Sequence, residues 1–244
     1  MSQADTNSDT LNDFTAEAAE PRRVVVLISG NGSNLQALID AQSYDELGGE
    51  IVAVISNKAD AYGLKRAHDA GIEAVALPHR EYDSREAFDG ALIKVIERHQ
   101  PDLVVLAGFM RILTPRFVQR YHGRLLNIHP SLLPAYPGLD THARALADGV
   151  EEHGVSVHFV TEDLDGGPVV MQAALKVRPG DSEERLVARI HAREHLIYPI
   201  AVRWFLEGRL QLGTEGPTLD GTALPPQGMR LSHDDAAEEL DEEL

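Results

Sequence analysis

Short apolar runs alternate along the chain with segments whose apolar residues recur at helical spacing. The runs, bounded by turn residues, predict buried strands, and the segments between them predict helices. We expect strands at residues 23–29, 51–56, 73–77, 102–108 and at the start of RLLNIHPSLLPAYP (124–137). We expect helices at residues 33–41, 62–70, 84–100, with Ser84 as the N-cap, and 115–121. This βαβ rhythm indicates a parallel sheet flanked by helices.

The pattern changes in the C-terminal third of the chain. The runs VSVHFV (155–160) and VVMQAALKV (169–177) are separated by a span short enough for an antiparallel hairpin. The amphipathic segment 182–207 predicts a closing helix, with Pro199 as a kink or break. Residues 209–230 are expected to form a short tail over the surface. The fold class is therefore α/β, with a mostly parallel twisted sheet and a C-terminal antiparallel hairpin.

Composition indicates one globular domain at residues 21–230. The 244 residues include 43% hydrophobic side chains, which is enough for a substantial core. The formal net charge of −17 is concentrated at the ends: residues 1–20 hold five acids and residues 231–244 hold seven, with no Lys or Arg in either segment. Because these acidic segments can bury little apolar surface, we expect both to be disordered tails.

Several classes of function are disfavoured. The absence of cysteine excludes disulfides, thiolate nucleophiles and cysteine-based metal sites. No basic stripe indicates a nucleic-acid partner, and no apolar run reaches the roughly 18 residues of a membrane span. The N-terminus has neither a signal-peptide core nor the basic character of a transit peptide. We expect a cytoplasmic protein that acts on small molecules, as a monomer or a weak homodimer.

The first candidate site is SGNGSNLQALI (29–39), which follows the first strand and opens the first helix. Glycines allow close backbone approach, and unpaired amides at a helix N-terminus attract anions. One interpretation is a phosphate held by Gly32, Ser33 and Asn34; a turn in which Ser33 or Asn34 caps the helix is compatible with it. Dinucleotide binding is less favoured, because Leu35 stands at the third glycine position of G-x-G-x-x-G.

The second candidate site is the pair Asn127 and His129 at the end of a predicted strand. Alternate strand residues share a face, so these two side chains point away from Leu126 and Ile128. A single strand histidine is more often a hydrogen-bonded core residue than a catalyst. Here, however, the pair precedes PSLLPAYPG, a loop whose three prolines restrict its freedom. Two donors that converge in this way can stabilise an oxyanion, and histidine can also move protons.

Two further features are weaker. Asp165, in DLDGGP, could supply a carboxylate, but by itself it is equally well a turn acid before two glycines. His191 and His195 have the i, i+4 spacing of zinc ligands, yet HAREH lacks the glutamate of H-E-x-x-H. We therefore expect no metal.

Six strings in order resemble a known family. They are VVLISGNGSNLQALID (25–40), SNKADAYGLKRA (56–67), LAGFMRILTP (106–115), LLNIHPSLLPAYPG (125–138), HGVSVHFVTEDLDGGPV (153–169) and REHLIYP (193–199). Together they resemble phosphoribosylglycinamide formyltransferase over about residues 23–228. The resemblance implies a Rossmann-like formyltransferase fold. It also implies transfer of a formyl group from 10-formyltetrahydrofolate to the amine of 5'-phosphoribosylglycinamide in de novo purine synthesis, by direct attack through a tetrahedral intermediate.

The resemblance also implies roles for individual residues. The catalytic triad maps to Asn127, His129 and Asp165, with Asp165 favouring the cationic form of His129. The ribonucleotide phosphate maps to Gly32, Ser33 and Asn34, and its ribose to Glu194. The residues implied for folate binding are Arg85, Met110, Arg111, Ile112, Leu113, Asn127, Thr161, Glu162, Asp163, Leu164 and Asp165. No metal is required, and 10-formyltetrahydrofolate acts as a co-substrate.

The alternatives are a formyltetrahydrofolate deformylase, a methionyl-tRNA formyltransferase and a non-catalytic nucleotide-binding module. The first normally carries an additional N-terminal domain and the second a C-terminal one, and the sequence leads us to expect neither. The third accounts for the glycine loop but not for Asn127, His129 and Asp165 together. One departure from the family pattern is Asp140, where histidine is common; it leaves the triad intact and puts details of the loop in doubt.

Overall fold

The computed structural model describes residues 20–231. The acidic tails predicted at residues 1–20 and 231–244 lie outside the described residues, except for Glu20 and Leu231.

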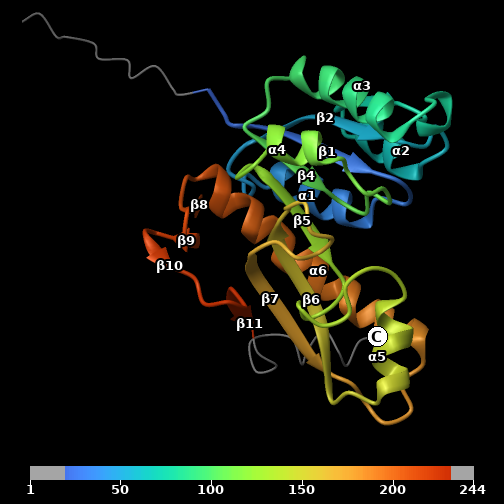
Figure 1. Cartoon of the computed structure of the whole chain (residues 1–244), viewed down its shortest axis with the longest axis vertical. Helices are drawn as coiled ribbons and strands as arrows, with labels where there is room; N and C mark the ends of the chain where they lie inside the picture. The colour runs from blue at the N-terminus through green and yellow to red at the C-terminus, as the bar shows by residue number, and fades with distance from the viewer. Residues whose placement is uncertain (1–19, 232–244) are drawn as a thin grey trace, which may run out of the picture.

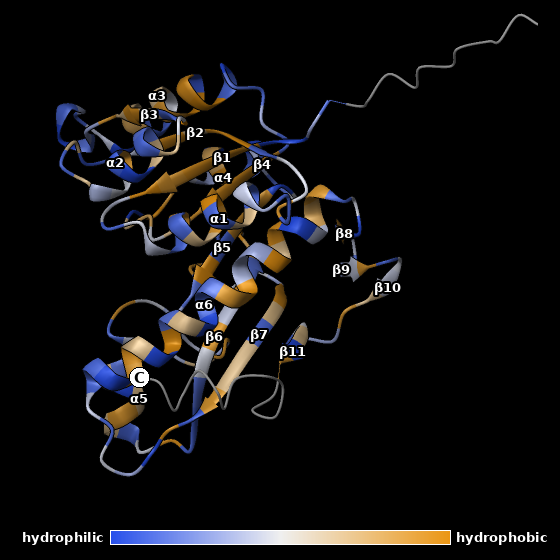
Figure 2. Ribbon diagram, turned by 180° about the vertical axis from the view of Figure 1, so that it is seen from behind, coloured by the Kyte–Doolittle hydropathy of each residue, from blue (hydrophilic) through white to orange (hydrophobic). Residues whose placement is uncertain are grey.

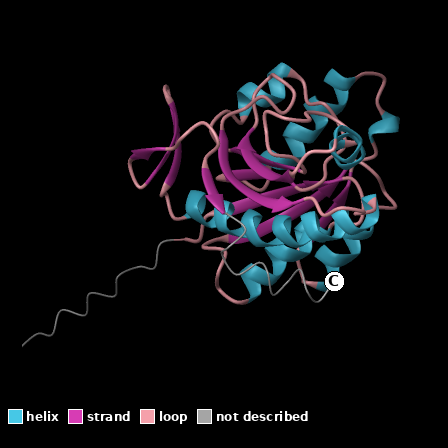
Figure 3. Ribbon diagram, turned by 90° about the horizontal axis from the view of Figure 1, so that it is seen from below, coloured by secondary structure: helices cyan, strands magenta, loops and turns pink. Residues whose placement is uncertain are grey.

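An eight-stranded sheet forms the centre of the molecule (Figures 1 and 3), with the strand order β11-β7-β6-β5-β4-β1-β2-β3. Its strands are β1 (Arg23–Ile28), β2 (Glu50–Ser56), β3 (Glu73–Ala76), β4 (Leu103–Leu106), β5 (Leu125–His129), β6 (Glu152–Phe159), β7 (Val169–Lys176) and β11 (Met229–Leu231). The strands β1 to β5 pair in parallel, β6 pairs antiparallel with β5 and with β7, and β11 pairs in parallel with β7. The predicted α/β fold with a C-terminal hairpin is confirmed.

Helices cover both faces of the sheet. They are α1 (Ser33–Ser43), α2 (Tyr62–Asp69), α3 (Arg85–Glu97), α4 (Pro115–Arg120), α5 (Thr141–Asp148) and α6 (Glu183–Leu206), with a 3₁₀ turn, η1, at His79–Glu81. One buried cluster joins α1 and α6 to alternate strand residues such as Val24, Val26 and Leu126. The intervening strand residues, such as Val25 and Leu27, pack with α3 and α4 on the other face. Figure 2 shows that β1 is coloured as hydrophobic, whereas β6 has hydrophilic stretches.

The N-caps follow from local sequence. Ser84 begins α3, as predicted, and its side chain accepts a hydrogen bond from the backbone N–H of Ala87. Thr114 and Ser182 cap α4 and α6 in the same way. Each cap satisfies an amide that the helix itself leaves without a partner.

Three features differ from the sequence-based expectations. Helix α5 was not predicted, because its eight residues, THARALAD, give little periodic signal. Of the predicted kink or break at Pro199, the break is wrong, since α6 continues through this residue: burial of Ile197, Tyr198 and Ala201 outweighs the roughly 3 kcal/mol cost of an interior proline. Residues 209–230 are more ordered than a surface tail. They form the small sheet of β8 (Leu210–Gly213), β9 (Gly216–Leu219) and β10 (Thr222–Ala223), and then enter β11.

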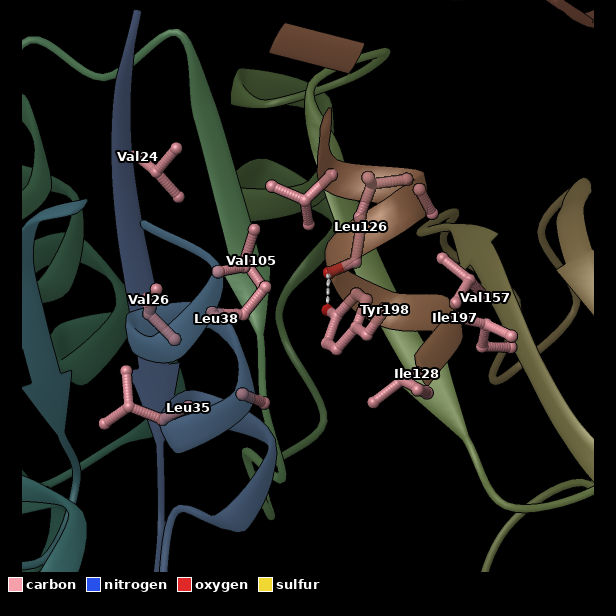
Figure 4. Close-up of a cluster of buried hydrophobic side chains, with 14 of the residues drawn as sticks. Val24, Val26, Leu35, Leu38, Val105, Leu126, Ile128, Val157, Ile197 and Tyr198 are labelled. Carbon is pink, nitrogen blue, oxygen red and sulfur yellow. Dashed lines mark hydrogen bonds between the residues drawn. The ribbon is translucent and has the colours of Figure 1, made fainter. Parts of the chain in front are cut away.

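Tyr198 joins α6 to the middle of the sheet (Figure 4). Its side chain is fully buried, and its hydroxyl lies 2.8 Å from the carbonyl oxygen of Leu106 in β4 and 3.2 Å from that of Leu126 in β5. A single hydroxyl hydrogen is thus shared between two strand carbonyls. The contact fixes α6 across the adjacent strands β4 and β5.

Candidate active site

The polar pair on β5 lies on the face predicted from the alternation. Leu126 and Ile128 belong to the buried cluster under α6, and Asn127 and His129 point to the opposite side. In the antiparallel register, Asn127 lies opposite His158 and His129 lies opposite Ser156. The two β strands therefore present a row of polar side chains on one face while the other face remains apolar.

Both ring nitrogens of His129 have defined neighbours. Nε2 lies 2.9 Å from the carbonyl oxygen of Tyr136, and Nδ1 lies 3.5 Å from Oδ2 of Asp165. Because a carbonyl only accepts, Nε2 carries a hydrogen and the Nδ1 edge faces the carboxylate. Only 6% of the His129 surface is exposed. The Asp165 carboxylate is thus placed as an ion-pair partner for the imidazole, at a distance longer than a typical hydrogen bond.

Asp165 is held by the proline-rich loop. Its Oδ2 accepts a hydrogen bond of 2.8 Å from the backbone N–H of Gly138. Asp165 and Tyr136 both have positive φ values, 50° and 53°, which are uncommon for residues with a side chain. Such strain is often found where a fold must aim functional groups. The proline-rich loop thus supplies a partner to both side chains: the carbonyl of Tyr136 for His129 and the backbone N–H of Gly138 for Asp165.

A buried polar network fixes this loop from below. The Ser156 hydroxyl donates to the carbonyl of Ser131 at 2.6 Å and accepts from the backbone N–H of Leu133 at 3.0 Å. The Gln172 amide donates to the carbonyl of Leu133 and to Ser156, both at 2.9 Å. Because all of these groups are buried, each bond avoids the cost of an unpaired polar atom. The loop is consequently anchored to β6 and β7.

The glycine loop has a geometry suited to an anion. Gly32 precedes α1 with φ of 77°, no side chain caps the helix, and its first turn holds no acid. A Cβ on Gly32 would lie 2.9 Å from the Cα of Gly63, so the loop packs directly against α2. The free amides and positive dipole end of α1 are thus directed at the cleft.

Arg66 braces the same loop from α2. Its Nε lies 2.9 Å from the carbonyl oxygen of Asn31, and its two terminal nitrogens lie 3.0 Å from Asn31 Oδ1 and Gln36 Oε1. The guanidinium also stacks 4.9 Å from the ring centroid of Tyr62. A planar, forked donor can make such paired contacts, and it restricts the loop before any ligand binds.

Glu194 on α6 faces the start of α1. Its Oε2 accepts a hydrogen bond of 2.8 Å from the Asn34 amide, while Asn34 Oδ1 is buried without a partner. Burial raises the pKa of Glu194, and the Asn34 hydrogen bond and His191 oppose this shift. The carboxylate and the unpartnered oxygen are two acceptors that can meet hydroxyl donors of a ligand.

Two cavities reach the carboxyl end of β5: Ile128 and Pro130, on either side of His129 in the chain, line the first, and Asn127 lines the second. The first, of about 400 Å³, is lined by Ser29–Asn34, Lys58, Ala107, Gly108, Met110, Ile128, Pro130, His142, His191 and Glu194. The second, of about 110 Å³, is lined by Leu106, Phe109, Arg111–Leu113, Val118, Asn127, His158 and Val160–Asp165. A third, open groove of about 660 Å³ lies between α1 and α6 and touches none of the predicted triad.

The structure brings most of the predicted site residues together. Gly32, Ser33, Asn34 and Glu194 line the first cavity, and the segments 111–113 and 161–165 line the second. Met110, predicted to bind folate, lines the first cavity instead. Arg85 is the exposed first residue of α3 and lines neither. No group of three His, Asp or Glu side chains suited to a metal occurs within residues 20–231.

Sequence reasoning missed His158, Arg66 and the Ser156–Gln172 network. His158 had a usable signal, because strand alternation places it on the face of Ser156 rather than that of Val157. Arg66 contacts Asn31 across 35 positions and had no signal of this kind. Within the described part of the chain, no helix is long and apolar enough to cross a membrane.

The profile of the formyl transferase family matches residues 22–202, so the chain belongs to this family. Phosphoribosylglycinamide formyltransferase of Escherichia coli K12 is 60% identical over 205 residues, which cover 84% of this chain and 97% of that protein. The human trifunctional purine biosynthetic protein adenosine-3 is 46% identical over 210 residues, 86% of this chain and 21% of that protein. The structure of phosphoribosylglycinamide formyltransferase from Coxiella burnetii in complex with CHES aligns with a TM-score of 0.84 at 55% identity, covering 87% and 100% of the two chains. The family predicted from the six motifs is confirmed.

Proposed function

We propose that the protein transfers the formyl group of 10-formyltetrahydrofolate to the amine of 5'-phosphoribosylglycinamide, with Asn127, His129 and Asp165 as its catalytic residues. The observation that carries the proposal is that Asn127 and Asp165 line the second cavity, while the two neighbours of His129 along the chain line the first, and Asp165 lies 3.5 Å from His129. A group held in one cavity can there meet a group held in the other. Family membership and 60% identity to a protein of this name support the same reaction.

The first cavity suits the ribonucleotide. Gly32, Ser33 and Asn34 offer backbone amides at the start of α1, where a phosphate is stabilised by hydrogen bonds and by the helix dipole. Glu194 lines the same cavity next to Asn34, where its carboxylate can accept from ribose hydroxyls. The amine of the substrate would then point along β5 towards His129.

The second cavity suits the folate co-substrate. Its walls combine apolar side chains, such as Leu106 and Leu113, with the loop 161–165, whose backbone can pair with a planar heterocycle. Arg111 lies at this cavity with its guanidinium 4.8 Å from the ring centroid of Phe88. Its buried Nε has no partner within the protein. Folate binding by Arg85 and by Met110 remains a prediction.

The catalytic groups have complementary tasks. As the amine attacks the formyl carbon, the Asn127 amide and the His129 imidazolium stabilise the negative charge that gathers on the formyl oxygen. The attacking amine must lose a proton and the departing nitrogen must gain one, and His129 with Asp165 can relay it through water. Holding both reactants in line lowers the barrier further.

An assay of tetrahydrofolate release with and without 5'-phosphoribosylglycinamide tests the proposal. We expect turnover only with the ribonucleotide, and formylated product in equal amount. Turnover without any amine acceptor would contradict the proposal and favour a formyltetrahydrofolate deformylase. Turnover with methionyl-tRNA as the acceptor would favour a methionyl-tRNA formyltransferase. The small-molecule partners follow from this proposal, whereas the absence of a metal, the cytoplasmic location and the choice between monomer and weak homodimer remain predictions.

A further inference from the structure

Asn127 pairs with a histidine that the proposed mechanism does not use. His158 Nε2 lies 3.0 Å from the amide nitrogen of Asn127, and His158 Nδ1 lies 2.9 Å from the carbonyl oxygen of Phe159. Only 2% of the His158 surface is exposed. The register of β6 against β7 shifts between Val157 and His158, and such a bulge re-aims a strand side chain.

The hydrogen positions of this pair are restricted because each hydrogen bond needs one donor and one acceptor. A carbonyl oxygen cannot donate, so His158 Nδ1 must carry a hydrogen. If His158 is neutral, Nε2 has a lone pair and accepts an N–H of Asn127. If His158 is charged, Nε2 also carries a hydrogen, and the Asn127 amide must turn its oxygen towards the ring. The charge of His158 therefore determines which way the amide of Asn127 faces.

The surroundings of His158 favour the neutral ring. The groups that face it are Asn127 and His129 on β5, Asp165 on the loop and the carbonyl of Phe159. Asp165 Oδ1 is 3.9 Å from Nε2, beyond hydrogen-bond distance, while Oδ2 of the same carboxylate is bound by Gly138. Burial is the largest effect and lowers the pKa of His158 to about 4, against the smaller opposing effects of Phe159 and Asp165.

We propose that His158 is a positioning residue which, in its neutral form with hydrogen on Nδ1, accepts one N–H of Asn127 and keeps the other N–H directed at the formyl oxygen. The inference rests on the proposed function, because it assigns the orientation of a donor in that reaction. A flipped amide would place its carbonyl oxygen where the donor stands. Attraction to the developing oxyanion would then become repulsion.

The form of the ring can be observed directly. Two-bond ¹H–¹⁵N correlation spectra of ¹⁵N-histidine-labelled protein distinguish the two neutral forms from the cation, and the His158→Gln variant assigns the His158 signals by their loss. We expect the Nδ1–H pattern, unchanged between about pH 6 and about pH 8.5, where free histidine titrates. An Nε2–H pattern, or titration in this range, would overturn the inference whether or not the enzyme is active.

Kinetics test the consequence for Asn127. His158→Gln keeps both a donor and an acceptor and should retain kcat to within about tenfold, whereas His158→Leu offers no acceptor and should lose about 10²-fold in kcat with the ribonucleotide KM nearly unchanged. In an Asn127→Ala background, His158→Leu should cost little more, because the group that it positions is gone. Thermal melts verify that each variant folds.

Two results would contradict the positioning role: wild-type kcat in His158→Leu, or the same loss in both backgrounds. These failures differ from failure of the proposed function. If the unsubstituted protein does not transfer formyl groups, the proposed function is wrong. If it does, but His158 shows the Nε2–H pattern, this inference alone is wrong.

Discussion

The two sides of the cleft hold their ligating groups by different means. At the side proposed to bind the phosphate, called the phosphate side below, the donors are backbone amides of the Gly32 loop, positioned by contacts with α2 such as Gly63 and Arg66. At the side proposed to be catalytic, called the catalytic side below, the groups are side chains, and each has a partner: His158 for Asn127, and the carbonyl of Tyr136 for His129. The first arrangement comes from a local turn, and the second from segments distant along the chain.

This difference predicts different responses to substitution. Backbone donors are lost only when the turn is distorted, so the phosphate side should respond mainly in the affinity for the ribonucleotide. Side-chain donors are lost one at a time, and because they act on the reacting atoms, the catalytic side should respond mainly in kcat. Substitutions on each side and a pH titration test this division.

Asp165→Asn should show the catalytic response most strongly. The amide keeps an acceptor for the Gly138 N–H but removes the anion that lies 3.5 Å from His129. We expect kcat to fall on the order of 10³-fold or more, with the ribonucleotide affinity nearly unchanged. The control is Asp148→Asn, an exposed carboxylate that accepts from the Tyr136 hydroxyl. Steady-state kinetics and calorimetric titration with the ribonucleotide separate the two parameters, and a parallel loss of affinity would break the comparison.

Gly32→Ala should show the phosphate-side response. The methyl group would be forced against the Cα of Gly63 while the backbone keeps a φ of 77°. We expect the ribonucleotide KM to rise about 10²-fold through loss of the anion site, with a smaller change in kcat. Gly71→Ala is a matched control, because it has a similar φ of 73° but open space around its Cβ. A ribonucleotide KM unaltered in Gly32→Ala would show that the turn does not carry the phosphate.

Arg66→Gln should weaken the same side less. The loop keeps its glycines but loses the forked contacts to Asn31. We expect a ribonucleotide KM about tenfold higher, an unchanged folate KM, and partial recovery in Arg66→Lys. The neighbouring Lys65→Gln, which removes an exposed pair with Asp69, should behave as the wild type. Equal changes in both KM values would mean that Arg66 supports the whole domain rather than this loop.

Acidification should destabilise the catalytic side first. Burial, assisted by His142 and His129, lowers the pKa of His153 to about 4 from an ordinary value of 6.5, and His158 shifts to about 4 as well. Between pH 4 and 6.5 these histidines bind more protons in the unfolded chain than in the folded one. The free energy of unfolding therefore falls as the pH drops from about 6.5 towards 4. Urea titrations should show a shallower pH dependence in His153→Gln. In hydrogen-exchange measurements at low pH, the backbone amides of β6 should lose protection before those of β1, and the reverse order would contradict the prediction.

The sequence predicted the two sides unequally. The turn of Gly32 to Asn34 and the face shared by Asn127 and His129 follow from spacings of a few residues, and the structure has both. The link between His129 and Asp165 came only from the family resemblance, since 36 positions separate them. His158, Arg66 and Gln172 act through contacts 16 to 39 positions long, which depend on strand order and register. Strand alternation indicates the face on which His158 lies, but no local pattern encodes the strand order and register.

The strand at the C-terminal edge has a protective consequence. β7 is buried along seven of its eight residues, six of which are apolar, and β11 pairs with its outer side at Met171, Gln172 and Ala173. The approach requires Gly228, where any Cβ would collide with the backbone of Val170. A long uncovered edge of this kind recruits strands from other molecules. By pairing with β7, β11 therefore reduces the tendency to aggregate. A truncation that removes β11 should lower solubility and expose the edge of β7, the strand that carries Gln172.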